Sequence, residues 1–149
     1  MTLPENIPTK AQWEPFRKGD LDYECAYKHF LGKSFSEAVE LFAKNALIYQ
    51  EDLCSMPPVP FRFYTLAFIK YLLSEKSRND SDGASTFLKL VRWKLEKDCD
   101  SIAPIMDEAL SCAQHIALNQ EFYDASVDIY GKFSEEFESI MKIWNKPKI

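Results

Sequence analysis

Glycine is scarce in this chain: its 149 residues include four, and no two of them lie close together. A loop that holds a phosphate group needs several glycines within a few residues, because the backbone must turn tightly around the ligand. The sequence therefore argues against a nucleotide site of this kind, and it predicts no cofactor.

Long apolar runs are also missing. The most apolar segment, residues 61–73, contains Arg62 and Lys70, whereas a membrane-spanning helix needs about 20 mostly apolar residues. The first residues, Met-Thr-Leu-Pro-Glu-Asn, have neither the positive charge nor the apolar stretch of a signal peptide. We expect a protein that neither spans a membrane nor is secreted.

The cysteines show no pairing pattern. Cys25, Cys54, Cys99 and Cys112 are widely spaced along the chain. In a sequence without a secretory signal, such spacing is typical of reduced thiols rather than of a disulfide framework. We therefore expect a cytoplasmic protein.

An excess of basic residues is absent as well, since 18 Lys and Arg stand against 23 Asp and Glu, a net charge of -5. Binding to nucleic acid needs positive charge massed on one face. The charge balance predicts that nucleic acid is not a partner. Hydrophobic residues make up 46% of the chain, enough for one domain over residues 1–149. We expect its ends to be flexible near residues 1–10 and 145–149.

The apolar residues recur at helical spacing between clusters of turn residues. Asp20 and Ser34 are expected to cap the first two helices, and Ser34-x-x-Glu37 has the pattern of a capping box. Two-residue alternation is nearly absent, so strands are not expected. The sequence predicts an all-α fold of about six helices in three antiparallel hairpins, as a compact bundle or a short α-solenoid. The predicted helices cover residues 21–31, from 34 onward, 60–76, 83–97, 101–118, and from Asn119 straight through Gly131 to Trp144, with a short extra turn around Trp13 and Phe16.

One segment resembles a known family. Gly32-Lys-Ser-Phe-Ser-Glu-Ala38-Val-Glu-Leu-Phe42 looks like the turn and second helix of a tetratricopeptide-type helical repeat, and residues 83–88 and 122–129 show weaker echoes. The chain departs from the motif at Asn45, where the family has alanine. The resemblance implies stacked helical hairpins that bind a peptide or protein along a concave groove.

Two Cys/His pairs are the candidates for metal chemistry. Cys25 and His29, and likewise Cys112 and His115, each share one helical face, and two such faces together would make a tetrahedral zinc site. Each pair also has the components of a cysteine nucleophile and base, although no third orienting group accompanies either. The alternative is two core cysteines beside partly exposed histidines. The sequence shows no catalytic motif.

Lys89, Trp93 and Lys97 form the candidate binding surface. They recur every four residues in the fourth predicted helix, opposite its apolar stripe. A tryptophan flanked by ammonium groups is typical of an interface that receives an acidic segment. Alternatively, Trp93 packs as a second core face with the lysine stems along it, the commoner arrangement for a middle helix.

These observations favour a non-enzymatic module, an adaptor or chaperone of helical-repeat type. It would bind another protein or a peptide. Three alternatives stay open: an immunity or antitoxin-like inhibitor that covers a basic toxin site, a metal-binding protein that uses the Cys/His pairs, and a homodimer joined through exposed aromatic residues.

Overall fold

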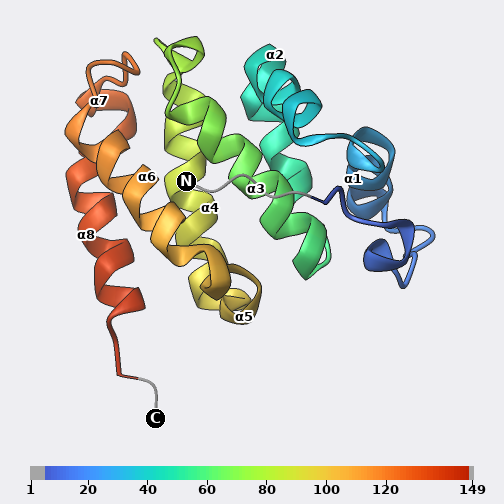
Figure 1. Ribbon diagram of the computed structural model, residues 1–149. Helices are drawn as coiled ribbons and strands as arrows, with labels where there is room; N and C mark the ends of the chain where they lie inside the picture. The colour runs from blue at the N-terminus through green and yellow to red at the C-terminus, as the bar shows by residue number, and fades with distance from the viewer. Residues whose placement is uncertain (1–5, 148–149) are drawn as a thin grey trace.

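The computed structural model describes residues 6–147. Within this range the chain is helical and contains no β-strand, which confirms the all-α prediction (Figure 1). The longer helices are α1 (Leu21–Phe30), α2 (Phe35–Leu53), α3 (Pro58–Leu72), α4 (Ser81–Lys97), α6 (Met106–Leu118) and α8 (Phe133–Trp144). The shorter elements are α5 (Cys99–Ile102), α7 (Val127–Tyr130) and the 3-10 helices η1 (Lys10–Trp13), η2 (Glu75–Ser77) and η3 (Ala103–Ile105).

Helix α3 is the centre of the core. Ten of its 15 residues are buried, so it has no polar face of its own, as expected for a helix surrounded by others. Phe68 joins three helices: its ring stacks on Phe42 of α2, with centroids 4.7 Å apart, and meets Phe87 of α4 edge-on at 5.7 Å. In Figure 1, α3 accordingly lies between α2 and α4.

Side-chain caps set the first helix boundaries as the sequence predicts. The Tyr23 amide donates to Asp20 Oδ1 at 3.2 Å at the start of α1. Ser34 and Glu37 form the expected capping box, with the Ser34 amide donating to Glu37 Oε1 at 2.8 Å and the Glu37 amide to Ser34 Oγ at 3.1 Å. Each bond satisfies an amide that has no partner within the helix.

Helix α2 is interrupted at Asn45. The backbone there is extended (φ -163°, ψ 83°), and Asn45 Oδ1 accepts a hydrogen bond from the Ile48 amide at 3.2 Å. Asparagine is well suited to this geometry, because its short side chain caps the turn that follows. The residue that departs from the repeat motif is thus the one at which α2 bends.

The short turn predicted around Trp13 and Phe16 is present in part as η1, which ends at Trp13, so Phe16 lies outside it. Thr9 caps it, since its hydroxyl accepts from the Gln12 amide at 3.3 Å. Thr9 and Lys10 fall in a segment for which flexibility is predicted, but they belong to this capped helix. Residues 1–5 and 148–149, which fall under the same prediction, lie outside the described residues.

The predicted fifth helix, residues 101–118, is divided. Pro104 lies in η3, and the continuous helix α6 begins only at Met106, because Ile105 has non-helical angles (φ -114°, ψ 17°). Proline in a first turn is compatible with a helix. Here the turn is a separate 3-10 segment instead.

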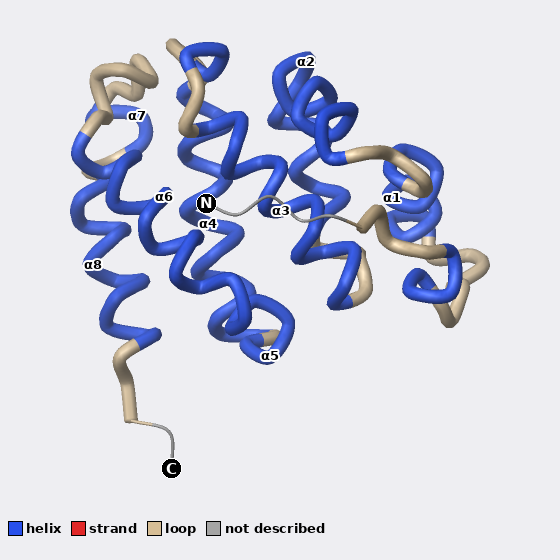
Figure 2. Tube along the Cα trace, viewed as in Figure 1, coloured by secondary structure: helices blue, strands red, loops and turns tan. Residues whose placement is uncertain are grey.

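The prediction of one long helix from Asn119 to Trp144 is wrong. Asn119 ends α6, and its Nδ2 donates to the His115 carbonyl at 2.7 Å. Turns, the single-turn α7 and Gly131 (φ 72°, ψ -176°) separate it from α8 (Figure 2). The Gln120 side chain holds this break, because its Nε2 donates to the Gly131 carbonyl at 2.8 Å while its Oε1 accepts from the Phe133 amide at 2.9 Å.

Replacing Gly131 by alanine is expected to lower the free energy of unfolding by about 1–3 kcal/mol, because its backbone angles are nearly exclusive to glycine. No atom lies within 4 Å of the position a Cβ would take, so the loss would come from the backbone alone. Urea denaturation followed by circular dichroism measures it. Ser134→Ala, at an exposed position of α8, is the control and should change stability by less than about 0.5 kcal/mol. Equal stability of the Gly131→Ala variant would contradict the argument.

Candidate protein-binding surface

Helix α4 separates a buried face from an exposed one. Trp93 is 46% exposed, and Lys89 and Lys97, one turn to either side, are exposed too. Trp93 is therefore about half covered rather than buried as a full second core face. The predicted apolar stripe is buried as expected and comprises Ala84, Phe87, Leu88, Val91 and Leu95.

A pocket of about 300 Å³ lies beside Trp93. Helix α4 supplies most of its wall, and Glu136 of α8 closes the far side. We call the three residues predicted from sequence, together with this pocket, the Trp93 surface. The lining residues are Lys89, Arg92, Trp93, Glu96, Lys97 and Glu136.

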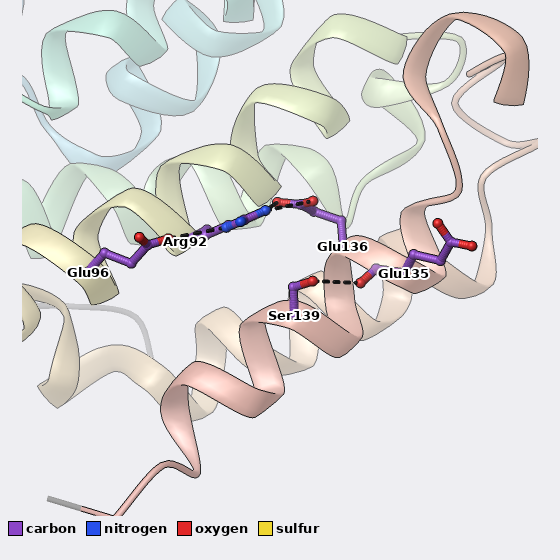
Figure 3. Close-up of polar contacts among 5 residues, drawn as sticks. All are labelled: Arg92, Glu96, Glu135, Glu136 and Ser139. Atoms are coloured by element: carbon purple, nitrogen blue, oxygen red, sulfur yellow. Dashed lines mark hydrogen bonds and ion pairs between the residues drawn. The ribbon is translucent and has the colours of Figure 1, made fainter.

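Arg92 forms the bridge from α4 to α8 across the pocket. Its Nε donates to Glu96 Oε1 at 3.1 Å, and its Nη1 donates to the two carboxylate oxygens of Glu136 at 3.3 and 3.4 Å. Figure 3 shows Arg92 between these carboxylates, while Glu135 points away from it. The bonds to Glu136 and then Glu96 raise the pKa of the Arg92 guanidinium. Exposed ion pairs contribute about 0–1 kcal/mol, so their main effect here is to hold the pocket wall in place.

Lys94 is the buried neighbour of Trp93 on α4. Only 2% of its side chain is exposed, and its Nζ lies 4.3 Å from the ring centroid of Phe61 and 5.6 Å from that of Trp93. Asp98 Oδ2, at 3.3 Å, supplies the opposite charge. An ammonium group over an aromatic face is attracted to it. The Trp93 indole thus contacts the Lys94 ammonium group, while 46% of the Trp93 residue stays exposed to a partner.

A second pocket, of about 250 Å³, adjoins the first and shares Lys89 and Glu136 with it. Helix α8 and the segment before it form one side, and α4 forms the other. The two pockets are thus neighbours along the seam between α4 and α8. The second pocket is lined by Ser85, Leu88, Lys89, Tyr130, Gly131, Lys132, Phe133, Glu135, Glu136 and Ser139.

The two candidate Cys/His pairs do not come together as a zinc site. The described residues contain no group of three or more His, Cys, Asp or Glu side chains placed to hold a metal ion. Cys25 is exposed on α1 and Cys112 is fully buried on α6, and these helices lie on opposite sides of the molecule in Figure 1. Spacing within one helix places two ligands on a face but does not determine which faces meet.

The two histidines have other contacts. His29 Nδ1 lies 2.6 Å from Asp52 Oδ2, joining α1 to α2, and the His115 ring meets Tyr123 edge-on. Burial raises the pKa of the Cys112 thiol. Because the thiolate is the nucleophilic form, Cys112 is a core residue rather than a partner for base catalysis by His115.

Asp52→Asn is expected to change how stability depends on pH. Burial raises the pKa of Asp52, and His29 offsets this only in part, while Glu51 and Asp22 add to it. Because the folded state binds the Asp52 proton more tightly than the unfolded state does, it is stabilised at low pH. This stabilisation is fully present below the unfolded pKa of about 3.9 and is lost as pH rises through the raised folded pKa. The asparagine variant lacks this loss. The stability of the wild type relative to the variant should therefore fall as pH rises from about 3.9 through the raised folded pKa of Asp52.

Urea denaturation of both proteins across this pH range gives the difference directly. A difference that stays constant, or that grows with pH, would contradict the prediction.

Some residues of the surface escaped the sequence analysis. Arg92 and Glu136 are distant in sequence, and only the packing of α4 on α8 brings them together. Lys94 carried a signal, because it follows the buried Leu90 by four residues and Phe87 by seven, positions that share one helical face. Its positive charge works against this signal, because a lysine is seldom fully buried.

No protein-family model, curated protein or solved structure matches the chain. The resemblance to tetratricopeptide-type repeats therefore stays a prediction. Among the described residues, every helix is too short or too polar to traverse a lipid bilayer.

Proposed function

We propose that this protein is a non-enzymatic binding module, an adaptor or chaperone, that recognises another protein or a peptide through the Trp93 surface. The observation that carries the proposal is the half-exposed Trp93 beside a pocket of about 300 Å³. Tryptophan is enriched among residues that dominate binding energies, because a large ring gains much from burial at little entropic expense. A tryptophan left open on a core helix is therefore best explained by a partner that covers it.

The charges around Trp93 support an acidic partner segment. Lys89 and Lys97 are exposed on either side of the indole, and complementary charge increases both the rate and the specificity of association. The four cysteines are free thiols. This supports the cytoplasmic location that forms part of the proposal, because reduced cysteines persist in that compartment.

Trp93→Ala is expected to weaken partner binding at least about tenfold, the range of a central interface residue. The experiment is affinity purification of the tagged protein from its own cells, with bound proteins identified by mass spectrometry and titrated against each variant. Lys89→Glu/Trp93→Ala should lose the partner entirely.

The matched control is Phe16→Ala, which truncates an aromatic side chain of similar exposure, 49%, outside the Trp93 surface. The control should retain the partner, and both variants should keep the helical circular dichroism spectrum. A partner that binds the Trp93→Ala variant as tightly as the wild type would place the interface elsewhere.

A further inference from the structure

The spacing of the Trp93 surface points to the form of its partner. Lys89, Trp93 and Lys97 occupy one row of α4 at intervals of four residues. With a rise of 1.5 Å per residue, the two lysines lie about 12 Å apart along the helix axis, with the indole midway. A ligand that pairs with both lysines must bring two negative groups to this separation, with an apolar group between them.

The charged groups of the Trp93 surface that have no ion-pair partner in the described part of the chain are positive. Within the described residues neither Lys89 nor Lys97 forms an ion pair. Arg92, by contrast, is already neutralised by Glu96 and Glu136. The two lysines are therefore the groups left for a partner, and carboxylates are the groups that complement them.

The shape of the surface suits a helix. The pocket lies between two rows of α4, one of Lys89, Trp93 and Lys97 and the other of Arg92 and Glu96, and α8 borders it through Glu136. Rows four residues apart form ridges, and the groove between them receives the ridge of another helix. A segment that binds by pairing its backbone with a sheet edge finds none on α4, whose backbone groups bond within the helix, whereas a helix in a groove is held by its side chains.

We propose that the partner segment is an acidic amphipathic α-helix that lies along α4. One large apolar side chain enters the pocket beside Trp93, and carboxylates four residues before and after it pair with Lys89 and Lys97. This deepens the proposed function and rests on it, because it names the class of segment that the same surface receives.

The chain does not itself supply such a segment. No helix of residues 6–147 carries two carboxylates seven or eight residues apart. A second copy of the protein therefore lacks the complementary pattern, and the occupant is a different chain.

The test uses three synthetic peptides of equal length and equal net charge, titrated into the whole protein by calorimetry. The first is a cross-linked helix with glutamates four residues on either side of one leucine. The second is the same helix with both glutamates moved to the opposite face. The third is proline-flanked and extended, with glutamates two residues on either side of leucine, which gives a similar separation of about 13 Å.

We expect the first peptide to bind at least about tenfold more tightly than the other two. Lys89→Glu/Lys97→Glu should remove this preference, and a version of the first peptide with lysines in place of glutamates should bind that double variant instead. Non-specific hydrophobic binding to Trp93 would not respond to this exchange of charges.

Other results would overturn the inference. If the extended peptide binds as tightly as the helix, the partner class is wrong, although the surface still binds. If no peptide binds while the cellular partner still depends on Trp93, the acidic helix is wrong and the proposed function stands. If sedimentation shows a dimer that Trp93→Ala dissociates, the occupant is a second copy. A cellular partner indifferent to Trp93 would instead remove the proposed function.

Discussion

Replacing Phe68 by alanine is expected to lower the free energy of unfolding by about 3–5 kcal/mol, the range for removing a buried aromatic ring. The Phe68 side chain is fully buried, and its ring is the contact that ties α3 to Phe42 of α2 and Phe87 of α4. Its loss removes apolar burial and leaves a cavity that three packed helices cannot close without moving. Urea denaturation followed by circular dichroism measures the effect.

Phe68→Leu separates the two parts of this effect. Leucine keeps most of the apolar volume but not the ring stack on Phe42, which is worth about 0.5–1.5 kcal/mol. We expect this variant to lie between the wild type and Phe68→Ala. A loss below about 1 kcal/mol for the alanine variant would show that the α2–α3–α4 packing tolerates the cavity and that Phe68 is not its centre.

The sequence predicted well where a single segment carries its own signal. Helix α3 is apolar nearly all round, and this pattern alone predicted its central place. The box of Ser34 and Glu37 is likewise local, since both partners lie within one turn. Such features need no knowledge of the rest of the chain, because the groups that stabilise them are already neighbours.

The sequence failed where distant contacts decide the backbone. The apolar spacing continues from Phe122 through Gly131 to Trp144, so periodicity alone predicted one helix. The Gln120 side chain instead bonds to the Gly131 carbonyl and the Phe133 amide, and these bonds replace those that a continuous helix would make there. A pattern of apolar residues carries no information about these side-chain hydrogen bonds of Gln120.

The same limit applies to the candidate site. The row of Lys89, Trp93 and Lys97 was found because it lies on one helix, whereas the Arg92–Glu136 pair depends on the tertiary contact of α4 with α8. The candidate zinc site of the Cys/His pairs does not form for the related reason that helical faces were identified but the faces that pack against them were not. Residues that recur every four positions therefore identify a surface on one helix. They say little about a site that is shared between two helices.

Lys94 connects the core to the Trp93 surface. Its stem is buried between helices, and its ammonium group lies over the rings of Phe61 and Trp93 while Asp98 balances its charge. The hydrogen bond from Ser101, followed by the charge of Lys94, lowers the pKa of Asp98, so the carboxylate that balances Lys94 stays ionised to a lower pH than a free aspartate. The position of the exposed indole thus depends on a residue that a partner does not reach.

Lys94→Ala is expected to lower the free energy of unfolding by about 2–5 kcal/mol, because truncating a buried unbranched side chain leaves a cavity. The same change removes the cation beneath Trp93. Partner binding, measured where both proteins remain folded, should therefore weaken as well. Denaturant unfolding gives the stability, and the titration used for Trp93→Ala gives the affinity.

Lys94→Met distinguishes the stem from the charge. Methionine fills nearly the same volume without a cation, and replacing a buried ion pair by an apolar side chain is often neutral or stabilising. Because Asp98 is 46% exposed, water solvates its carboxylate once the ammonium group is gone. We expect stability within about 1.5 kcal/mol of the wild type. If the methionine variant is as unstable as the alanine variant, the ammonium group itself holds the site, and packing of the stem is the lesser contribution.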